Sequence, residues 1–255
     1  MEQSLYNRLK TDLGLSDSVN EYIEVLVRKM DEESLTEEEF QKLATTHSIK
    51  VNDVTVDEAI SKIRGYYIVS VFQILEAFLV SLNDYLNKYS AGFRKREDGE
   101  SMLKYLCCRL IDMKKVNDED YLFFLICDYY RLVRNYIAHV DNVRKIDNAY
   151  ECIKVRQDEI NDKFEKLIAP NSIKEIGFDD FILYSRAVKK LAKKMIENIQ
   201  YDLDKVAQSF DASKYTKLKN APERIEKSIR YELQVKFPLN SRDVEYIVAK
   251  LVQEM

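Results

Sequence analysis

The chain contains little glycine and little proline. Its 255 residues include five glycines and three prolines. Tight turns, bulges and flexible linkers are built largely from these two residue types. Their scarcity therefore argues against a sheet-rich sandwich, a collagen-like repeat and a disordered linker. Hydrophobic residues make up 46% of the chain and charged residues 33%, which allows both a buried core and a solvated surface.

Histidine is also nearly absent, because the chain contains only His47 and His139. Two histidines exclude a multi-histidine metal site and the H-E-x-x-H metalloproteases. The few glycines exclude a glycine-rich loop that cradles phosphates. Most familiar enzyme classes are therefore excluded, and we expect neither a metal nor a cofactor. His47 falls in a predicted connector and is interpreted as a surface or packing residue.

Signals for export and for membrane insertion are missing. There is no run of about 20 apolar residues, the length that a membrane-spanning helix needs, and MEQSLYNRLK at the start lacks a secretory apolar stretch. The four cysteines lie at positions 107, 108, 127 and 152 and include no C-x-x-C pair. We interpret them as reduced packing thiols. The expectation is a cytoplasmic protein with no membrane segment.

Charge is distributed unevenly along the chain. Residues 1–60 carry 14 acidic and 6 basic side chains, a net charge of −8, so the overall charge of −4 leaves +4 for residues 61–255. The acidic runs at 31–33 and 37–39 would repel a nucleic-acid backbone. Two interpretations remain open. The acidic segment is either a solvated helical surface, or it docks against a partner or screens the basic part.

Helix-start signals are frequent in the first part of the chain. Three pairs fit the S/T-x-x-E capping box, namely Ser18 with Glu21, Thr36 with Glu39, and Thr55 with Glu58. They predict three short helices before about residue 45, a connector at 47–53 and a long helix over about 56–89. Apolar residues recur along the long helix at spacings of three and four, which is typical of a core-facing stripe.

The rest of the chain predicts further helices and no strand. A polar loop spans Gly92–Gly99, and helices are expected at about 100–113, 118–140, 149–168 and 178–208, with Asn117 opening the second of them. A separate tail has a helix after Pro222, a break at Pro238 and a last helix capped by Asn240. The predicted fold is all-α. An antiparallel helical bundle at 54–208 is flanked by an acidic helical segment at 1–53 and a helical tail at 209–255.

The most informative segment is the helix predicted at 118–140, which ends in YYRLVRNYIAHVDN. Its apolar stripe consists of Ile126, Tyr130, Val133, Ile137 and Val140. At about 100° per residue, Arg131, Asn135 and His139 form one polar stripe opposite the apolar one. Arg134 and His139 bracket this polar face about 140° apart. A second copy packed on the face about a two-fold axis could bring arginine and histidine from both chains into one cleft.

These residue types suit RNA cleavage without a metal. The 2′-hydroxyl attacks the adjacent phosphorus and yields a 2′,3′-cyclic phosphate and a 5′-hydroxyl. His139 can transfer the proton near neutral pH, and the guanidinium of Arg134 can stabilise the phosphate oxygens as charge develops. Asn135 can orient the imidazole or donate to the phosphate. DNA lacks the 2′-hydroxyl and would not be cleaved in this way. The alternative from the spacing alone is a solvated polar face.

Residues 134–139, RNYIAH, resemble the R-N-x-x-x-H signature of HEPN domains (higher eukaryotes and prokaryotes nucleotide-binding). The surrounding sequence is similar as well. A long apolar helix with an acidic residue, here Glu76, comes first, and Asp147, Tyr150 and an amphipathic helix opening with GFDD follow. The resemblance covers roughly residues 56–208. It implies an all-α bundle, commonly dimeric, and many members are metal-independent endoribonucleases in toxin–antitoxin, abortive-infection and CRISPR-linked defence.

The resemblance also implies roles for individual residues. Arg134 and His139 are the expected catalytic pair and Asn135 the supporting polar residue. Glu76 is a further supporting candidate, either pairing with Arg134 or simply reaching solvent. Arg131 is a supporting candidate from its place on the polar stripe of the helix. Members that are paired with a nucleotidyltransferase antitoxin usually have tyrosine two residues after the histidine, where this chain has Asp141. The pattern for silencing by nucleotidylation of that tyrosine is therefore incomplete here.

Two groups of basic residues are candidates for binding RNA. Arg186, Lys189, Lys190, Lys193 and Lys194 share one helical face, which either contacts phosphates or is a solvated face with helical ion pairs. Arg144 and Lys145 lie closer to the motif in the sequence and are the preferred candidates.

The expected function is a homodimeric endoribonuclease of a toxin or antiviral defence system, restrained by an antitoxin or regulatory protein. The acidic segment or the tail could provide the docking surface for that regulator. Two alternatives remain. One is a non-catalytic helical module that binds a nucleotide or a partner protein through the same polar face. The other is a helical subunit of a larger effector.

Overall fold

The computed structural model describes residues 2–32, 36–52, 54–115, 118–139, 143–211, 214–215 and 222–253. In this part of the chain the only β-type pairing is an isolated bridge between Ser90 and Tyr201. The helices are α1 (Glu2–Glu32), α2 (Glu37–Thr46), α3 (Val56–Tyr89), α4 (Met102–Leu110), α5 (Glu119–His139), α6 (Val143–Lys154), α7 (Gln157–Phe164), α8 (Phe178–Glu197), α9 (Leu203–Gln208), α10 (Pro222–Lys236) and α11 (Ser241–Gln253). The predicted all-α fold is confirmed.

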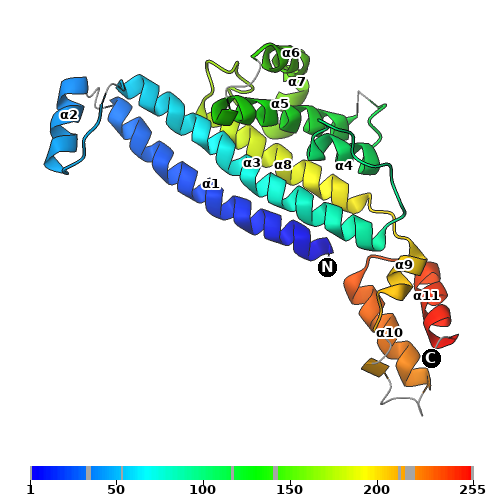
Figure 1. Cartoon of the computed structure of the whole chain (residues 1–255). Helices are drawn as coiled ribbons and strands as arrows, with labels where there is room; N and C mark the ends of the chain where they lie inside the picture. Colours follow the sequence, from blue (N-terminus) through cyan, green and yellow to red (C-terminus); the bar gives the residue numbers. More distant parts are fainter. Residues whose placement is uncertain are drawn as a thin grey trace.

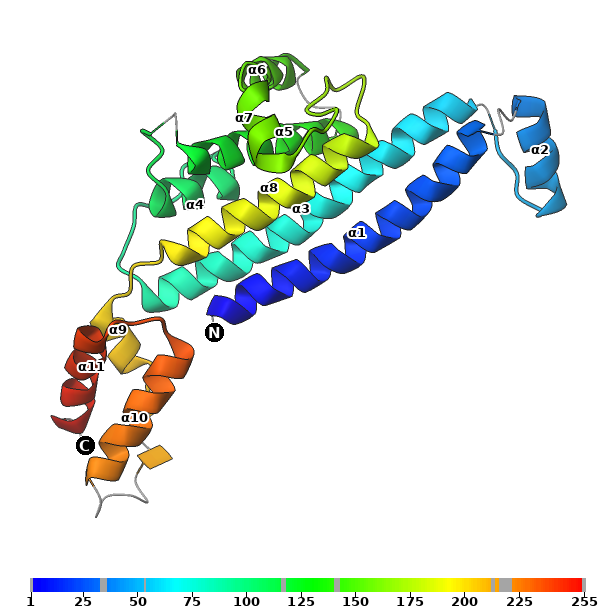
Figure 2. The same ribbon diagram turned by 180° about the vertical axis from the view of Figure 1, so that it is seen from behind.

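Four long helices, α1, α3, α5 and α8, form an antiparallel bundle in which α1 and α5 run against α3 and α8 (Figures 1 and 2). Polar contacts fix their register. Glu24 of α1 pairs with Arg64 near the start of α3 at 2.9 Å. Asp17 pairs with Lys189 of α8 at 2.6 Å. The side of the bundle away from α1 carries α4, α6 and α7 (Figure 1).

α3 is the central helix, and its predicted span of 56–89 is confirmed. It starts at the predicted capping box, in which Glu58 N donates to Thr55 Oγ1 at 3.2 Å and Thr55 N donates to the Glu58 carboxylate at 3.0 Å. Its buried stripe includes Ile68, Val71, Leu75, Leu79 and Leu82, each at most 2% exposed. By length and composition alone α3 could cross a membrane, but the core helices of soluble proteins share these properties, and half of its most apolar stretch is buried here.

The N-terminal part differs from its prediction. Residues 2–32 form one continuous helix in place of the first short helices, and only the capping box of α2, Thr36 with Glu39, marks a new start. Ser18 lies inside α1, where its hydroxyl donates to the carbonyl oxygen of Gly14 at 3.0 Å. Leu9 and Leu13 of α1 are buried in the main core. The acidic segment 1–53 is therefore not a separate unit, because α1 belongs to the bundle and α2 alone stands apart (Figure 1).

Two further predicted helices are interrupted. The helix expected at 149–168 is replaced by α6 and α7, with a break at 155–156. The helix expected at 178–208 ends at Glu197, and α9 begins at Leu203 after a turn. The break between α8 and α9 turns the chain across the end of α3. There Asp202 N donates a hydrogen bond to Tyr89 O at 3.0 Å. The helix expected at 100–113 is shorter, as α4, and the predicted cap Asn117 lies outside the described residues.

The last helices form a second core. Val206 and Ala207 of α9 pack with buried residues of α10 and α11, such as Leu233 and Ile247. Tyr85 and Tyr89 at the end of α3 join the same core, and this unit projects from the end of the bundle (Figure 2). Packing therefore starts the C-terminal unit before the predicted boundary at residue 209. The predicted cap of α11 is present, since Asp243 N donates to Asn240 Oδ1 at 2.9 Å.

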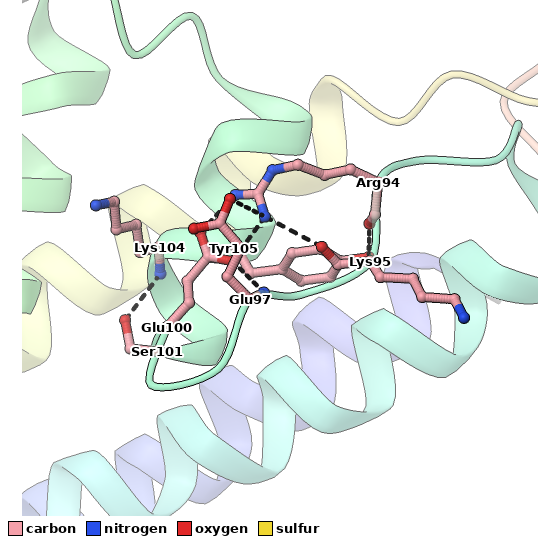
Figure 3. A network of polar contacts seen from close by, with 7 residues as sticks. All are labelled: Arg94, Lys95, Glu97, Glu100, Ser101, Lys104 and Tyr105. Atoms are coloured by element: carbon pink, nitrogen blue, oxygen red, sulfur yellow. Dashed lines mark hydrogen bonds and ion pairs between the residues drawn. The ribbon is translucent and has the colours of Figure 1, made fainter.

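The predicted polar loop at 92–99 is held closed mainly by the ion pair of Arg94 with Glu100, and Arg94 also lies 3.7 Å from Glu97 (Figure 3). Both Arg94 guanidinium nitrogens donate to the Glu100 carboxylate, at 2.8 and 2.5 Å. The Tyr105 hydroxyl donates to the Arg94 carbonyl at 3.0 Å, and the guanidinium also lies 5.6 Å from the Tyr105 ring. The hydrogen bonds from Arg94 lower the pKa of Glu100 to about 2.

We expect this closure to be lost in acid. Because the pKa of Glu100 is lowered on folding, its contribution is fully present above the ordinary glutamate value of about 4.3 and disappears as pH falls through about 2. NMR titration of the Glu100 carboxylate should give a pKa near 2. Replacing Arg94→Ala should return that pKa to about 4.3. Lys104→Ala is the matched control, because the charge of Lys104 contributes least to the lowered pKa of Glu100. An unshifted Glu100 in the wild type would contradict the closure.

Candidate functional site

The candidate motif lies on the last turns of α5, which packs against both α3 and α8. Its predicted apolar stripe is confirmed where the structure describes it, since Ile126, Tyr130 and Val133 are fully buried. Ile137 is partly buried, and its Cδ1 would lie 3.2 Å from a Cβ atom added at Gly65 of α3. Gly65 therefore permits a close approach of α3 and α5 at the motif. Val140 and Asp141 lie outside the described residues.

Arg134 is held against α3. Its guanidinium carbon lies 4.5 Å from the ring centre of Phe72, a cation–π contact. Its Nη1 donates to Asn135 Oδ1 at 3.2 Å, and its Nε is buried without a partner. Among the described residues this is the only hydrogen bond of the guanidinium. A guanidinium has five N–H donors, so most of them remain available to an anion while the group itself is positioned.

Asn135 is partly buried and contacts Arg134, not His139. Its Oδ1 accepts from the guanidinium, which fixes the amide beside the positive charge. Of the two roles expected for Asn135, orienting the imidazole has no support within one copy of the chain. The amide nitrogen, a donor, is left to contact a ligand or a second copy.

His139 is exposed at the end of α5. Among the described residues it makes no hydrogen bond or ion pair. It lies five residues after Arg134 on the same helix, about 7.5 Å along the axis. The two side chains are therefore not brought together by one copy of the chain, in agreement with the helical geometry expected from the sequence.

The two supporting candidates lie apart from this arrangement. Glu76 is exposed and forms no ion pair with Arg134, whose neighbour on α3 is Phe72 instead. Of its two interpretations, the structure favours the one in which Glu76 reaches solvent. Arg131 pairs with Asp128 of the same helix at 2.7 Å. Its charge is thus already compensated next to the motif.

The predicted basic face of α8 is not an open surface. Every member has a partner: Arg186 donates to the Phe164 carbonyl, Lys189 pairs with Asp17, Lys190 lies over the Phe123 and Phe164 rings, Lys193 pairs with Glu197, and Lys194 pairs with Asp120. Only Lys193 of this set is exposed. The reason is that α8 packs against α1, α3 and α5 and lies beside Phe164 of α7, so its long cationic side chains extend along neighbouring helices.

Arg144 and Lys145 are better placed to meet RNA. Both are exposed on α6, which packs against α5 through the buried residues Ile146 and Ile153. α6 begins four residues after His139. These two residues therefore remain the candidates for contacts with an RNA backbone.

A buried carboxylate that the sequence reasoning did not single out positions the motif helix. Asp180, at the start of α8, is fully buried and accepts four hydrogen bonds, each 2.8 Å long: from the Tyr130 hydroxyl, the Asn171 amide nitrogens of backbone and side chain, and Gly177 N. Burial raises the pKa of Asp180, while these hydrogen bonds oppose the shift. An aspartate three residues after Gly177, where its carboxylate can accept from the backbone N–H of the N-cap residue, was a usable signal. Nothing in the sequence pointed to Tyr130 as its further partner.

Comparison with known proteins finds no matching family model, no matching curated protein and no matching solved structure. In the described part of the chain, no group of three or more His, Cys, Asp or Glu side chains is arranged to hold a metal ion. The assignment of function therefore rests on the chemistry of α5 and its surroundings.

Proposed function

We propose that the chain is a metal-independent endoribonuclease of a toxin or antiviral defence system. It acts in the cytoplasm at a site shared by two copies, and it resembles HEPN domains in its motif. The observation that carries the proposal is the arrangement of the Arg134 side chain. Its guanidinium is fixed between the Phe72 ring and the Asn135 amide and still has N–H groups that can donate to an anion. The exposed His139 lies on the same helix.

The separation of Arg134 and His139 supports a shared site. Two copies that pack on this face of α5 about a two-fold axis would place the arginine of one copy near the histidine of the other. In each such centre one His139 takes the proton from the 2′-hydroxyl and then gives it, as the imidazolium, to the departing 5′-oxygen. Arg134 stabilises the charge on the phosphate oxygens. The products are a 2′,3′-cyclic phosphate and a 5′-hydroxyl.

The surroundings suggest where RNA and a regulator would bind. Arg144 and Lys145 are exposed on α6 and extend the positive charge beyond the motif. An antitoxin or regulatory protein would dock on α2 or on the C-terminal unit, because both lie outside the bundle (Figure 1).

We expect purified protein to cleave RNA in the presence of EDTA. His139→Ala and Arg134→Ala should each lower the rate by at least about 100-fold, since each removes a group that acts on the transition state. Lys10→Ala is the control, because that lysine is exposed on α1, across the bundle from α5 (Figure 1). The new 3′ ends should carry 2′,3′-cyclic phosphates, and a substrate with 2′-deoxy sugars should not be cleaved.

The result also decides between the proposal and its main alternative. Cleavage that requires added metal, or that leaves 5′-phosphate ends, would rule out this mechanism. No cleavage by any folded variant, together with equal growth of cells that overexpress wild type and His139→Ala, would favour the non-catalytic binding module. Growth arrest that is lost in His139→Ala at equal soluble yield would support the ribonuclease.

A further inference from the structure

An apolar stripe lies exposed on the outer side of α1. It consists of Leu15, Val19, Tyr22 and Leu26, which are 71%, 51%, 70% and 49% exposed. Val25, 66% exposed, widens it. We call these five residues the α1 stripe. The spacing of its first four members is 4-3-4, the repeat of a helix that packs against another helix.

The α1 stripe is not part of the bundle's own packing. α1 meets α3 and α8 through a different face, which includes Leu13, Asn20, Glu24 and Val27, all at most 7% exposed. α1 therefore carries apolar residues on two opposite faces, and only one of these faces is covered by other helices. Contiguous exposed apolar residues of this kind mark interaction surfaces in soluble proteins.

We propose that the α1 stripe pairs with the same stripe of a second copy, with the two α1 helices antiparallel. The positions themselves point to this occupant. Around a two-fold axis between residues 20 and 21, Leu15 faces the partner's Leu26, and Val19 faces the partner's Tyr22. In an antiparallel pair of helices each core layer combines one a and one d position, and this register satisfies that rule in every layer.

Charge complementarity supports the same register. One core layer beyond the stripe, Asp12 faces the partner's Lys29, and the symmetry repeats the pair at the other end. Both residues are exposed. The contact that Asp12 makes within its own chain, with Arg8, is 3.7 Å long and at least half exposed on both sides, so it is weak. A parallel arrangement would instead set Asp12 against Asp12 and Lys29 against Lys29.

This interface is separate from the proposed ribonuclease site. α3 and α8 lie between α1 and α5, so the α1 stripe and the motif occupy opposite sides of the bundle (Figures 1 and 2). The paired segment from residue 12 to residue 29 is about 26 Å long. A single pair of helices of this length is expected to bury a small area for a protein–protein interface. The association is therefore expected to depend on protein concentration.

Sedimentation velocity of the full chain across a concentration series tests the pairing. Val19→Glu should abolish the concentration-dependent rise in mass that the wild type shows through α1, because it places a charge against the partner's aromatic ring. Asp12→Lys and Lys29→Asp should each weaken association by about tenfold or more. The combined Asp12→Lys/Lys29→Asp chain should restore it. Val80→Glu, at an exposed apolar residue of α3 (48%), is the matched control and should leave the mass unchanged.

Two results would overturn the proposal. One is a wild-type mass equal to that of Val19→Glu at every concentration, with equal helix content by circular dichroism. The other is a combined charge reversal that associates no better than the single reversals. Neither result bears on catalysis. Arg134→Ala and His139→Ala should leave the association through α1 unchanged, whatever their effect on RNA cleavage.

Discussion

A mixture of two inactive variants, Arg134→Ala and His139→Ala, is expected to regain about a quarter of the wild-type RNA cleavage activity. In a shared site each active centre takes its arginine from one copy and its histidine from the other. A mixed dimer then has one intact centre and one that lacks both residues. Random exchange makes half of all dimers mixed, and each of these carries half of the wild-type centres.

The experiment needs subunit exchange before the assay and has a close control. His139→Ala mixed with the double variant Arg134→Ala/His139→Ala cannot form an intact centre, so it should remain inactive. If the first mixture also stays inactive after exchange has been verified by mass, each centre takes both residues from one chain. The spacing on α5 would then require a large rearrangement, and the two-copy site would be rejected.

The sequence predicts the helices best where local and long-range signals agree. Thr55 and Glu58 begin α3, and the apolar stripe that follows is buried as expected. Ser18 and Glu21 show the same local pattern, yet α1 continues through them. A serine inside a helix can bond to the carbonyl four residues earlier, and the packing of Leu13 and Val27 against the bundle favours one long helix.

The arrangement around the motif was predictable only in part. Helical geometry predicted that Arg134 and His139 need not touch within one chain, because their placement depends on a single helix. Partners on other helices depend on the packing of the whole bundle. The contact of Arg134 with Phe72, the exposure of Glu76 and the pairing of Lys189 with Asp17 are of this second kind. A basic face on a helical wheel shows which side chains lie together, but not which acids the neighbouring helices bring to them.

Removing the buried carboxylate in Asp180→Ala should lower the free energy of unfolding by about 3–5 kcal/mol. The change leaves the Tyr130 hydroxyl, Gly177 N and two nitrogens of Asn171 without their acceptor in a dry site. Tyr130→Phe removes only one of these donors and should cost about 1 kcal/mol. Urea denaturation of both variants measures the difference, and equal small losses would contradict the role of Asp180 as the link between α5 and α8.

The pH dependence of the same residue has the opposite sign to that of Glu100. Because burial raises the pKa of Asp180 in the folded state, the folded chain holds this proton more tightly than the unfolded chain. Its contribution to the free energy of unfolding therefore declines as pH rises from about 4 through the raised pKa. Asp180→Asn cannot ionise, so the stability difference between wild type and this variant should shift against the wild type over that range. A difference that is constant with pH would show that Asp180 titrates like an exposed aspartate, despite its burial against Tyr130.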